Sequence, residues 1–271
     1  MTARILALLL AVPLLARAGE PFPDDTARVL PAGRLETGVF SPLRYGLTDR
    51  LELSGHPVLF LVAPNAELKV AWGEPGGVAL ATVHGLLYPT PMMRLLSREG
   101  TGGIVPADVR YPHILATSQH LLASVGLERH LLTARAGGRL ATNLTSFDGP
   151  RFWSQVEWHF VWPRMAAWFT GWSLDAGLAA DGPLGGPFRY RLAVDAFAMP
   201  GLRGGRQAWE GTALAEWRPS SRFRLRAGAW FSWAELPYGS RFLWPPFPCL
   251  DATWGWELGS APAAADGGPL R

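Results

Sequence analysis

The amino-acid sequence predicts an all-β fold: a closed antiparallel transmembrane β-barrel of about twelve strands, within a range of 10 to 14. Apolar and polar residues alternate with a period of two along one segment after another, which is typical of strands with one apolar and one polar face. Several of these segments run for 10 to 14 residues, whereas strands in soluble sheets usually have ~5 to 6. The 271 residues include 13 Trp, 31 Gly and 24 Pro, and that much Gly and Pro argues against a helical bundle.

The alternation is clearest between residues 207 and 218. Trp209, Ala213 and Trp217 fall on one face, and Glu210 and Glu216 fall on the other. The two tryptophans lie about 26 Å apart at ~3.3 Å per residue, close to the height of a lipid-facing band between two aromatic girdles. In a barrel that spans a membrane, the apolar face would contact lipid and the charged face would line the lumen.

Eleven further segments complete the predicted ring. They are residues 34–39, 50–54, 66–72, 78–87, 114–127, 132–140, 152–162, 165–180, 188–199, 222–233 and 250–258. The facing of 78–87 and 114–127 is ambiguous. An even number of strands places both ends of the ring on the same side of the membrane.

Parity assigns a set of charged side chains to the lumen and a set of aromatic side chains to the lipid interface. The predicted lumen-lining residues are Arg135, Arg139, Arg189, Arg191, Arg222, Arg224, Arg226, Glu157, Asp175, Asp195, Glu210 and Glu216. The predicted lipid-interface aromatic residues are Trp158, Trp162, Trp168, Trp172, Trp209, Trp217, Phe223 and Trp233. Two interpretations of the lumen charges stay open: salt bridges between neighbouring strands fill a narrow lumen, or a water-filled pore favours anions through its arginines.

Turn-forming residues divide the segments. Tight turns are expected at 73–76, 163–164 and 219–221, where Gly, Pro and Ser gather. Residues 88–112 form a long connection in which Thr90-Pro91, an N-cap residue followed by proline, predicts a short helix that docks in the barrel mouth. Residues 236–248 form a second long connection, rich in proline and aromatic residues. With the strands as counted, the two fall at opposite ends of the barrel, against the usual pattern of short turns on one side and long loops on the other.

Residues 1–18 have the features of a cleavable secretory signal peptide. Arg4 supplies a positive charge, residues 5–15 are apolar, and Ala16-Arg17-Ala18 is a small-x-small cleavage site. The apolar run is shorter than the ~20 residues that a spanning helix needs, and the lone Cys249 excludes an intramolecular disulfide. We therefore expect a signal peptide at 1–18, the barrel at 19–258 and a flexible C-terminal tail at 259–271.

The segment from Gly33-Arg34-Leu35-Glu36 through Leu53 resembles the first hairpin of uncharacterised outer-membrane barrels from Gram-negative bacteria. Its specific part is Tyr45-Gly46-Leu47-Thr48-Asp49-Arg50-Leu51-Glu52-Leu53, and the resemblance covers under a tenth of the chain. It implies only the barrel fold and a place in the bacterial outer membrane. It implies no activity, because those proteins mostly lack an assigned one. Such barrels usually end in a strand with an aromatic last residue, whereas here Trp254-Gly255-Trp256 is followed by the tail.

The charge balance excludes a nucleic-acid-binding protein. The formal net charge of +3 includes Arg4 and Arg17 of the leader, so the remaining chain carries 23 basic and 22 acidic residues. The six histidines show no spacing typical of a metal site. We expect no metal, no cofactor and no nucleic-acid partner.

The arrangements nearest to a nucleophile with a base do not amount to a catalytic site. They are Ser118 with His130, and Ser154 with His159 and Glu157. Ser154 and His159 have opposite parity, so one of them would face lipid, and no Gly-x-Ser-x-Gly pattern is present. The sequence therefore predicts a protein that is not an enzyme.

These observations predict a monomeric barrel of the bacterial outer membrane. Its expected partners are outer-membrane lipids and, during insertion, the barrel-assembly machinery. It is either a narrow porin-like channel for small polar or anionic solutes or a plugged structural barrel. The alternative from another class is a secreted soluble β-sandwich that binds a ligand, but the apolar rows would then leave exposed patches larger than soluble proteins tolerate.

Overall fold

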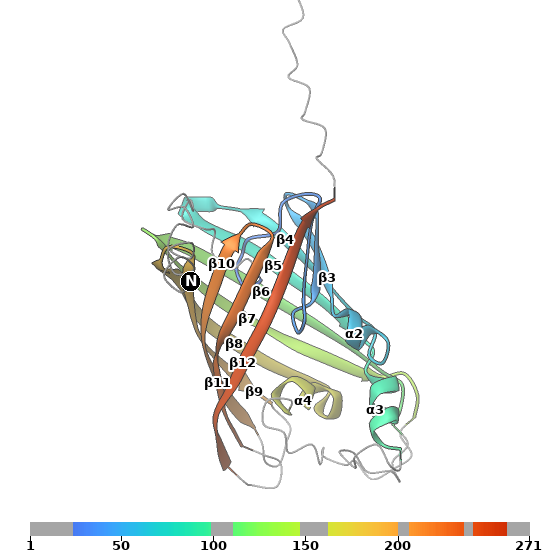
Figure 1. Ribbon diagram of the computed structural model, residues 1–271. Helices are drawn as coiled ribbons and strands as arrows, with labels where there is room; N and C mark the ends of the chain where they lie inside the picture. The colour runs from blue at the N-terminus through green and yellow to red at the C-terminus, as the bar shows by residue number, and fades with distance from the viewer. Residues whose placement is uncertain (1–23, 99–110, 147–161, 200–205, 236–240, 259–271) are drawn as a thin grey trace, which may run out of the picture.

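In the computed structural model, residues 24–98, 111–146, 162–199, 206–235 and 241–258 are described. They form a closed barrel of twelve antiparallel strands in which each strand pairs with the next and β1 closes on β12 (Figure 1). The predicted fold class and strand number are thereby confirmed. The predicted signal peptide and C-terminal tail lie outside the described residues.

The strands run from five to 17 residues in length. The strands are β1 (Arg34–Gly38), β2 (Leu43–Thr48), β3 (Leu51–Gly55), β4 (Asn65–Gly73), β5 (Val78–Leu87), β6 (Ile114–Leu127), β7 (His130–Asn143), β8 (Trp172–Gly185), β9 (Phe188–Ala198), β10 (Gln207–Ser220), β11 (Phe223–Glu235) and β12 (Arg241–Glu257). The helical elements are α2 (Pro57–Phe60), η1 (Pro75–Gly77), α3 (Thr90–Leu96) and α4 (Trp162–Thr170). Among the described helices, none has the length and apolar content needed to cross a membrane.

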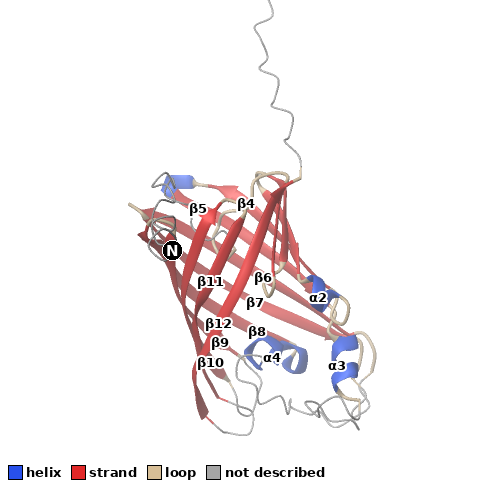
Figure 2. Cartoon of the chain, viewed as in Figure 1, coloured by secondary structure: helices blue, strands red, loops and turns tan. Residues whose placement is uncertain are grey.

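The two ends of the barrel have different connections. Tight turns join β2 to β3, β4 to β5, β6 to β7, β8 to β9 and β10 to β11, and the strand ends at Arg34 and Glu257 lie at this same end, called the turn end. The other connections, among them residues 39–42, 56–64 and 88–113, lie at the other end, called the loop end. Strands make the whole wall, whereas α2, α3 and α4 lie towards the loop end (Figure 2).

The predicted number of strands is correct, but the predicted membership is not. The structure adds β2, which the prediction omitted, and β7 pairs directly with β8, so no strand from 152–162 stands between them; residues 152–161 themselves lie outside the described residues. With β2 included, 88–113 follows β5 and 236–240 follows β11, so both connections lie at the loop end. The expected conflict with the short-turn, long-loop pattern therefore disappears.

Two segment boundaries are also wrong. Residues 165–170, predicted as strand, belong to α4, and the predicted tight turn at 163–164 lies inside that helix. Pro163 suits the first turn of a helix, and Gly171, with φ of 89° and its N–H bonded to the Ala167 carbonyl at 2.8 Å, ends it. The last strand starts at Arg241 instead of 250. Its pairing with β11 is irregular between Trp230 and Ser232, opposite Pro245 and Pro246, which cannot donate to a ladder.

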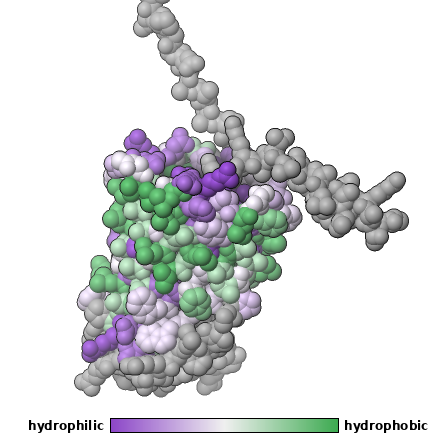
Figure 3. Space-filling model, turned by 90° about the vertical axis from the view of Figure 1, so that its left-hand side faces the viewer, coloured by the Kyte–Doolittle hydropathy of each residue, from purple (hydrophilic) through white to green (hydrophobic). Residues whose placement is uncertain are grey.

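The alternation of side chains inverts the usual soluble pattern. Large apolar residues such as Leu178, Leu192 and Trp209 are exposed on the outside of the wall, while Glu210 and Glu216, on the opposite parity, are buried. Figure 3 shows one face of the barrel, with hydrophobic residues over the wall and hydrophilic residues near its upper rim.

Candidate functional site in the barrel lumen

A chain segment lies inside the barrel, which the sequence did not predict. Residues 24–33, called the N-terminal segment, precede β1 and are held by the inner wall through their backbone. The Leu30 N–H donates to Glu52 Oε2 at 2.8 Å, and Lys69 Nζ donates to the carbonyl oxygens of Asp24 and Arg28 at 3.0 and 3.2 Å. Because Glu52 and Lys69 come from β3 and β4, one side of the wall grips the segment.

An apolar contact holds the segment to β5 and β6. Ala27 packs with Ala81 and Leu122, and all three are buried. The Ala27 N–H also donates to Ser124 Oγ at 2.9 Å. These inner positions of β5 and β6 are small or apolar because they contact protein and not water, which is why the sequence pattern there left the facing ambiguous.

The Asp24 carboxylate meets three arginines of the inner wall, one from β2 and two from β11. Arg44 Nη1 lies 2.5 Å from Asp24 Oδ1, Arg224 Nη1 lies 3.6 Å from the same oxygen, and Arg226 Nη2 donates to Oδ2. Burial alone would raise the pKa of Asp24, but the guanidinium groups of Arg226, Arg44 and Arg224 hold the pKa well below its ordinary value. Asp24 is therefore a charged anchor for the segment.

Each of those arginines has a second carboxylate on the wall. Arg44 binds Glu52 at 2.7 Å, Arg224 Nη2 binds Glu36 at 2.6 Å, and Arg226 Nε lies 3.3 Å from Glu216. The pairs join β2 to β3, β11 to β1 across β12, and β11 to β10. This agrees with the salt-bridge interpretation of the turn-end lumen.

The loop-end half of the lumen holds a second group of ion pairs. Asp175 on β8 accepts from Arg139 at 2.7 Å and lies 3.0 Å from His120 Nε2. Asp195 on β9 pairs with Arg135 at 2.7 Å. The wall is thus braced on the inside from β6 to β9.

Helix α4 supplies a lumen cation that the sequence reasoning missed. Arg164 donates to both oxygens of Glu210, at 2.5 and 2.6 Å, and its guanidinium lies 5.5 Å from the centre of the Phe197 ring. Ala166 packs against Phe197, Met199 and inner-wall alanines. α4 therefore lies within the loop-end mouth. The signals for it were Pro163 in the first turn and Gly171 after the last residue.

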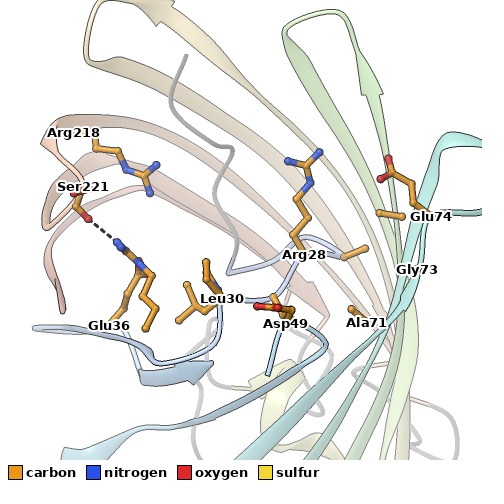
Figure 4. Close-up of a pocket in the computed structure, with 14 residues that line it drawn as sticks. Arg28, Leu30, Glu36, Asp49, Ala71, Gly73, Glu74, Arg218 and Ser221 are labelled. Atoms are coloured by element: carbon orange, nitrogen blue, oxygen red, sulfur yellow. Dashed lines mark hydrogen bonds and ion pairs between the residues drawn. The ribbon is translucent and has the colours of Figure 1, made fainter. Parts of the chain in front are cut away.

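Among the described residues, the lumen contains the following two cavities. One, called the vestibule, has a volume of about 560 Å³ near the turn end and is lined by residues 27–31 together with Arg34, Asp49, Glu74 and Arg218 (Figure 4). The other, called the chamber, has a volume of about 320 Å³ and is lined by Asp25, Arg191, Arg135, Asp195, Trp230 and, from α4, Arg164. The N-terminal segment contributes to the lining of both.

The structure places most predicted lumen residues on the inner wall. Arg135, Arg139, Arg189, Arg191, Arg224, Arg226, Asp175, Asp195, Glu210 and Glu216 share the inward parity of their strands. Arg222 is a correction: it lies in the exposed turn between β10 and β11, where the strand has already ended. Glu157 lies outside the described residues.

The aromatic residues fall in three groups. Trp172, Trp209, Trp217, Phe223 and Trp233 have the outward parity on β8, β10 and β11. Trp168 is a correction, because it belongs to α4 and not to a strand. Trp158 and the side chain of Trp162 lie outside the described residues.

Ser118 and His130, the catalytic arrangement that falls within the described residues, do not come together. His130 lies at the turn end and its Nδ1 is 2.8 Å from the Tyr190 hydroxyl, whereas Ser118 faces inward beside Gly85. Ser154, Glu157 and His159 lie outside the described residues. In the part of the chain that is described, no group of His, Cys, Asp and Glu has the geometry of a metal site.

No protein-family model matches the sequence, and no curated protein matches it either. Among solved structures, the chain is similar to the outer-membrane expressed OmpT of Vibrio cholerae, with 9% identity and a TM-score of 0.44 over 79% of this chain and 64% of that one. It is also similar to a bacterial polysaccharide outer membrane secretin, with 10% identity and a TM-score of 0.43 over 82% of this chain and 69% of that one. It is similar as well to OprD of Pseudomonas aeruginosa, with 11% identity and a TM-score of 0.40 over 84% of this chain and 61% of that one. The chain thus spans about two thirds of these proteins, and the likeness concerns the barrel fold alone.

Proposed function

We propose that this chain is a bacterial outer-membrane barrel that passes small polar or anionic solutes only when its N-terminal segment leaves the lumen. The inverted surface supports the membrane placement. Trp209 and Phe231 are about half exposed on the outer wall, while Glu216 and Asp181 are fully buried on the inner wall. Such an arrangement is unfavourable in water and favourable where hydrocarbon surrounds the wall.

The observation that carries the channel proposal is the N-terminal segment itself. A ring of twelve strands is wider than an eight-stranded barrel, which side chains fill, and narrower than a 16-stranded porin. Here a piece of the same chain occupies that width, held by Asp24 and by Leu30 and Ala27. Because the segment is held by side chains and not by a strand ladder, it can leave without breaking the barrel.

The test compares two proteins in planar lipid bilayers: the wild-type barrel and a variant that lacks residues 24–31. The wild-type barrel should stay closed for most of the recording, and the variant should show stable current steps. Deletion removes the carboxylates that face Arg44, Arg224, Arg226 and Arg191, so the opened lumen should prefer chloride over potassium. A folded variant without steps would overturn the channel proposal.

The membrane placement has its own test. A folded membrane barrel needs detergent for extraction and migrates differently on gels before and after boiling. Recovery of the protein in the soluble periplasmic fraction without detergent would overturn the placement and favour the soluble β-sandwich, whatever the bilayer recordings show.

A further inference from the structure

On the described part of the outer wall, a group of polar side chains lies among the apolar rows. Thr82 and His84 on β5, with Thr117 and Gln119 on β6, form what we call the polar patch; all four have the outward parity of their strands. His84 and Gln119 are direct register partners and both are exposed. Gln119 lies about 16 Å of strand from Ile114 and about 26 Å from Leu127 at ~3.3 Å per residue, so the patch is well inside the band that faces the membrane.

The hydrogen bonds within the patch leave part of it unused. His84 bonds through Nδ1 to Gln119 Oε1, and its Nε2 lies 2.9 Å from Thr82 Oγ1. Within the described residues, the Gln119 amide nitrogen has no hydrogen-bond partner. A polar group without a partner is unfavourable against hydrocarbon, and polar side chains in membranes commonly bond across protein interfaces.

The aromatic content of the wall changes at the same place. β5, β6 and β7 contain no Phe, Tyr or Trp at any position, although Tyr88 stacks on His113 just beyond the loop end of β5. Each strand from β8 to β12 has an outward aromatic residue: Trp172, Phe188, Trp209, Phe223 and Trp254. On the other side of this face, Trp72 of β4 donates to Thr82 Oγ1 at 2.9 Å. Since aromatic girdles anchor a barrel where it meets lipid, the absence of aromatic residues from β5–β7 favours a neighbour other than lipid.

The outward neighbours of the patch are exposed leucines, Leu86, Leu121 and Leu140, and small residues on β7. Gly138 on β7 is the register partner of Gln119, and Ala136 and Ala134 follow it on the same face. Small residues let a second backbone approach closely, which is how packed interfaces form inside membranes. The polar patch and the small residues beside it therefore make one continuous surface.

We propose that this surface, the outer wall of β5–β7, binds a second copy of the chain in the membrane, in place of the monomer expected from the sequence. The inference rests on the membrane placement proposed above. Copies inserted in the same direction are related by an axis along the membrane normal, so a residue near the axis meets itself at the same depth. A glutamine amide both donates and accepts, so Gln119 can pair with Gln119 of the second copy.

Cysteine cross-linking in isolated outer membranes tests this interface. In a Cys249→Ser background, Gln119→Cys should give an oxidant-dependent band at twice the monomer mass on non-reducing gels. The matched control is Ala213→Cys, which also faces outward but lies on β10, on the aromatic side of the wall; it should give no such band. Absence of the Gln119→Cys dimer, equal dimer from the control, or a cross-linked band of another mass would overturn the proposal.

A second pair of variants tests whether the polar groups of the patch hold the two copies together or merely lie near each other. Cross-linking through Thr117→Cys should fall several-fold when His84→Leu and Gln119→Leu are added, because the bonding groups are then gone. Unchanged cross-linking would show that the polar patch does not hold two copies together. Heat-dependent gel migration reports the barrel separately, so a folded barrel without cross-links overturns the interface and leaves the membrane placement intact.

Discussion

Replacing Asp24 by alanine should open the lumen. Asp24 is 16% exposed and meets Arg44 at 2.5 Å, Arg224 at 3.6 Å and Arg226 at hydrogen-bond distance. Removing one partner of a buried ion pair costs ~3 to 5 kcal/mol. The arginines keep Glu52, Glu36 and Glu216 as wall partners, so the lower value applies. A loss of ~3 kcal/mol corresponds to a roughly 150-fold rise in the ratio of open to closed barrels.

The assay is the fraction of time that a single barrel spends open in a planar bilayer. The matched control is Asp25→Ala, one residue along the same segment. The Asp25 side chain is 61% exposed and its contact with Arg191 is 3.4 Å, so its loss should cost at most ~1 kcal/mol, about a fivefold change.

Two outcomes would refute the reasoning. If Asp24→Ala leaves the open fraction of a folded barrel unchanged, Asp24 does not anchor the segment. If Asp25→Ala opens the barrel as much as Asp24→Ala, loss of charge and not the buried arginine contacts is responsible.

Three other predictions concern the pH dependence of opening, the ion pairs of the lumen and the facing of β10. Because the arginines lower the pKa of Asp24 in the closed state, the anchor is fully present above the ordinary Asp pKa of ~4 and is lost as pH falls through the lowered value. Opening is therefore expected below pH ~4 and not between 5 and 8; recordings at stepped pH should show this, and Asp24→Asn should remove that step. Arg226→Met should destabilise the barrel by ~3 kcal/mol in lipid-based urea unfolding, because Glu216 and Asp24 lose their partner, whereas Arg222→Met in the exposed turn should change it by less than ~0.5 kcal/mol; similar effects would contradict the locked network. Ala213→Arg, facing lipid, should cost ~2 to 4 kcal/mol in the same assay, while Thr212→Arg, facing the chamber, should be tolerated, and equal costs would show that the facing is wrong.

The two-residue alternation of apolar and polar residues was enough to predict the strands of the barrel wall and the direction in which their side chains face. Along β10, Trp209, Ala213 and Trp217 alternate with Glu210 and Glu216, and a strand with that pattern has only one way to face a membrane. The same alternation identified most of the ring because each strand carries its own pattern of lipid-facing and lumen-facing residues, and every strand pair except β1 with β12 joins neighbours in the sequence. It failed at β2, although Leu43, Tyr45 and Leu47 alternate there with Arg44, Gly46 and Thr48. It also failed at α4, where Trp168 and its apolar neighbours resemble one face of a strand.

Only the tertiary structure decided what fills the lumen. Asp24 is paired with Arg226 from the far end of the chain, and Glu210 with Arg164 from a helix, and no local pattern encodes contacts between residues so distant in sequence. The alternation distinguishes the lipid-facing side of each strand from the lumen-facing side, but it cannot say whether solvent or another segment covers the lumen-facing side. The apolar inner positions of β5 and β6, Ala81 and Leu122, became intelligible only with Ala27 packed against them, because closing the ring is what brings the N-terminal segment into their reach.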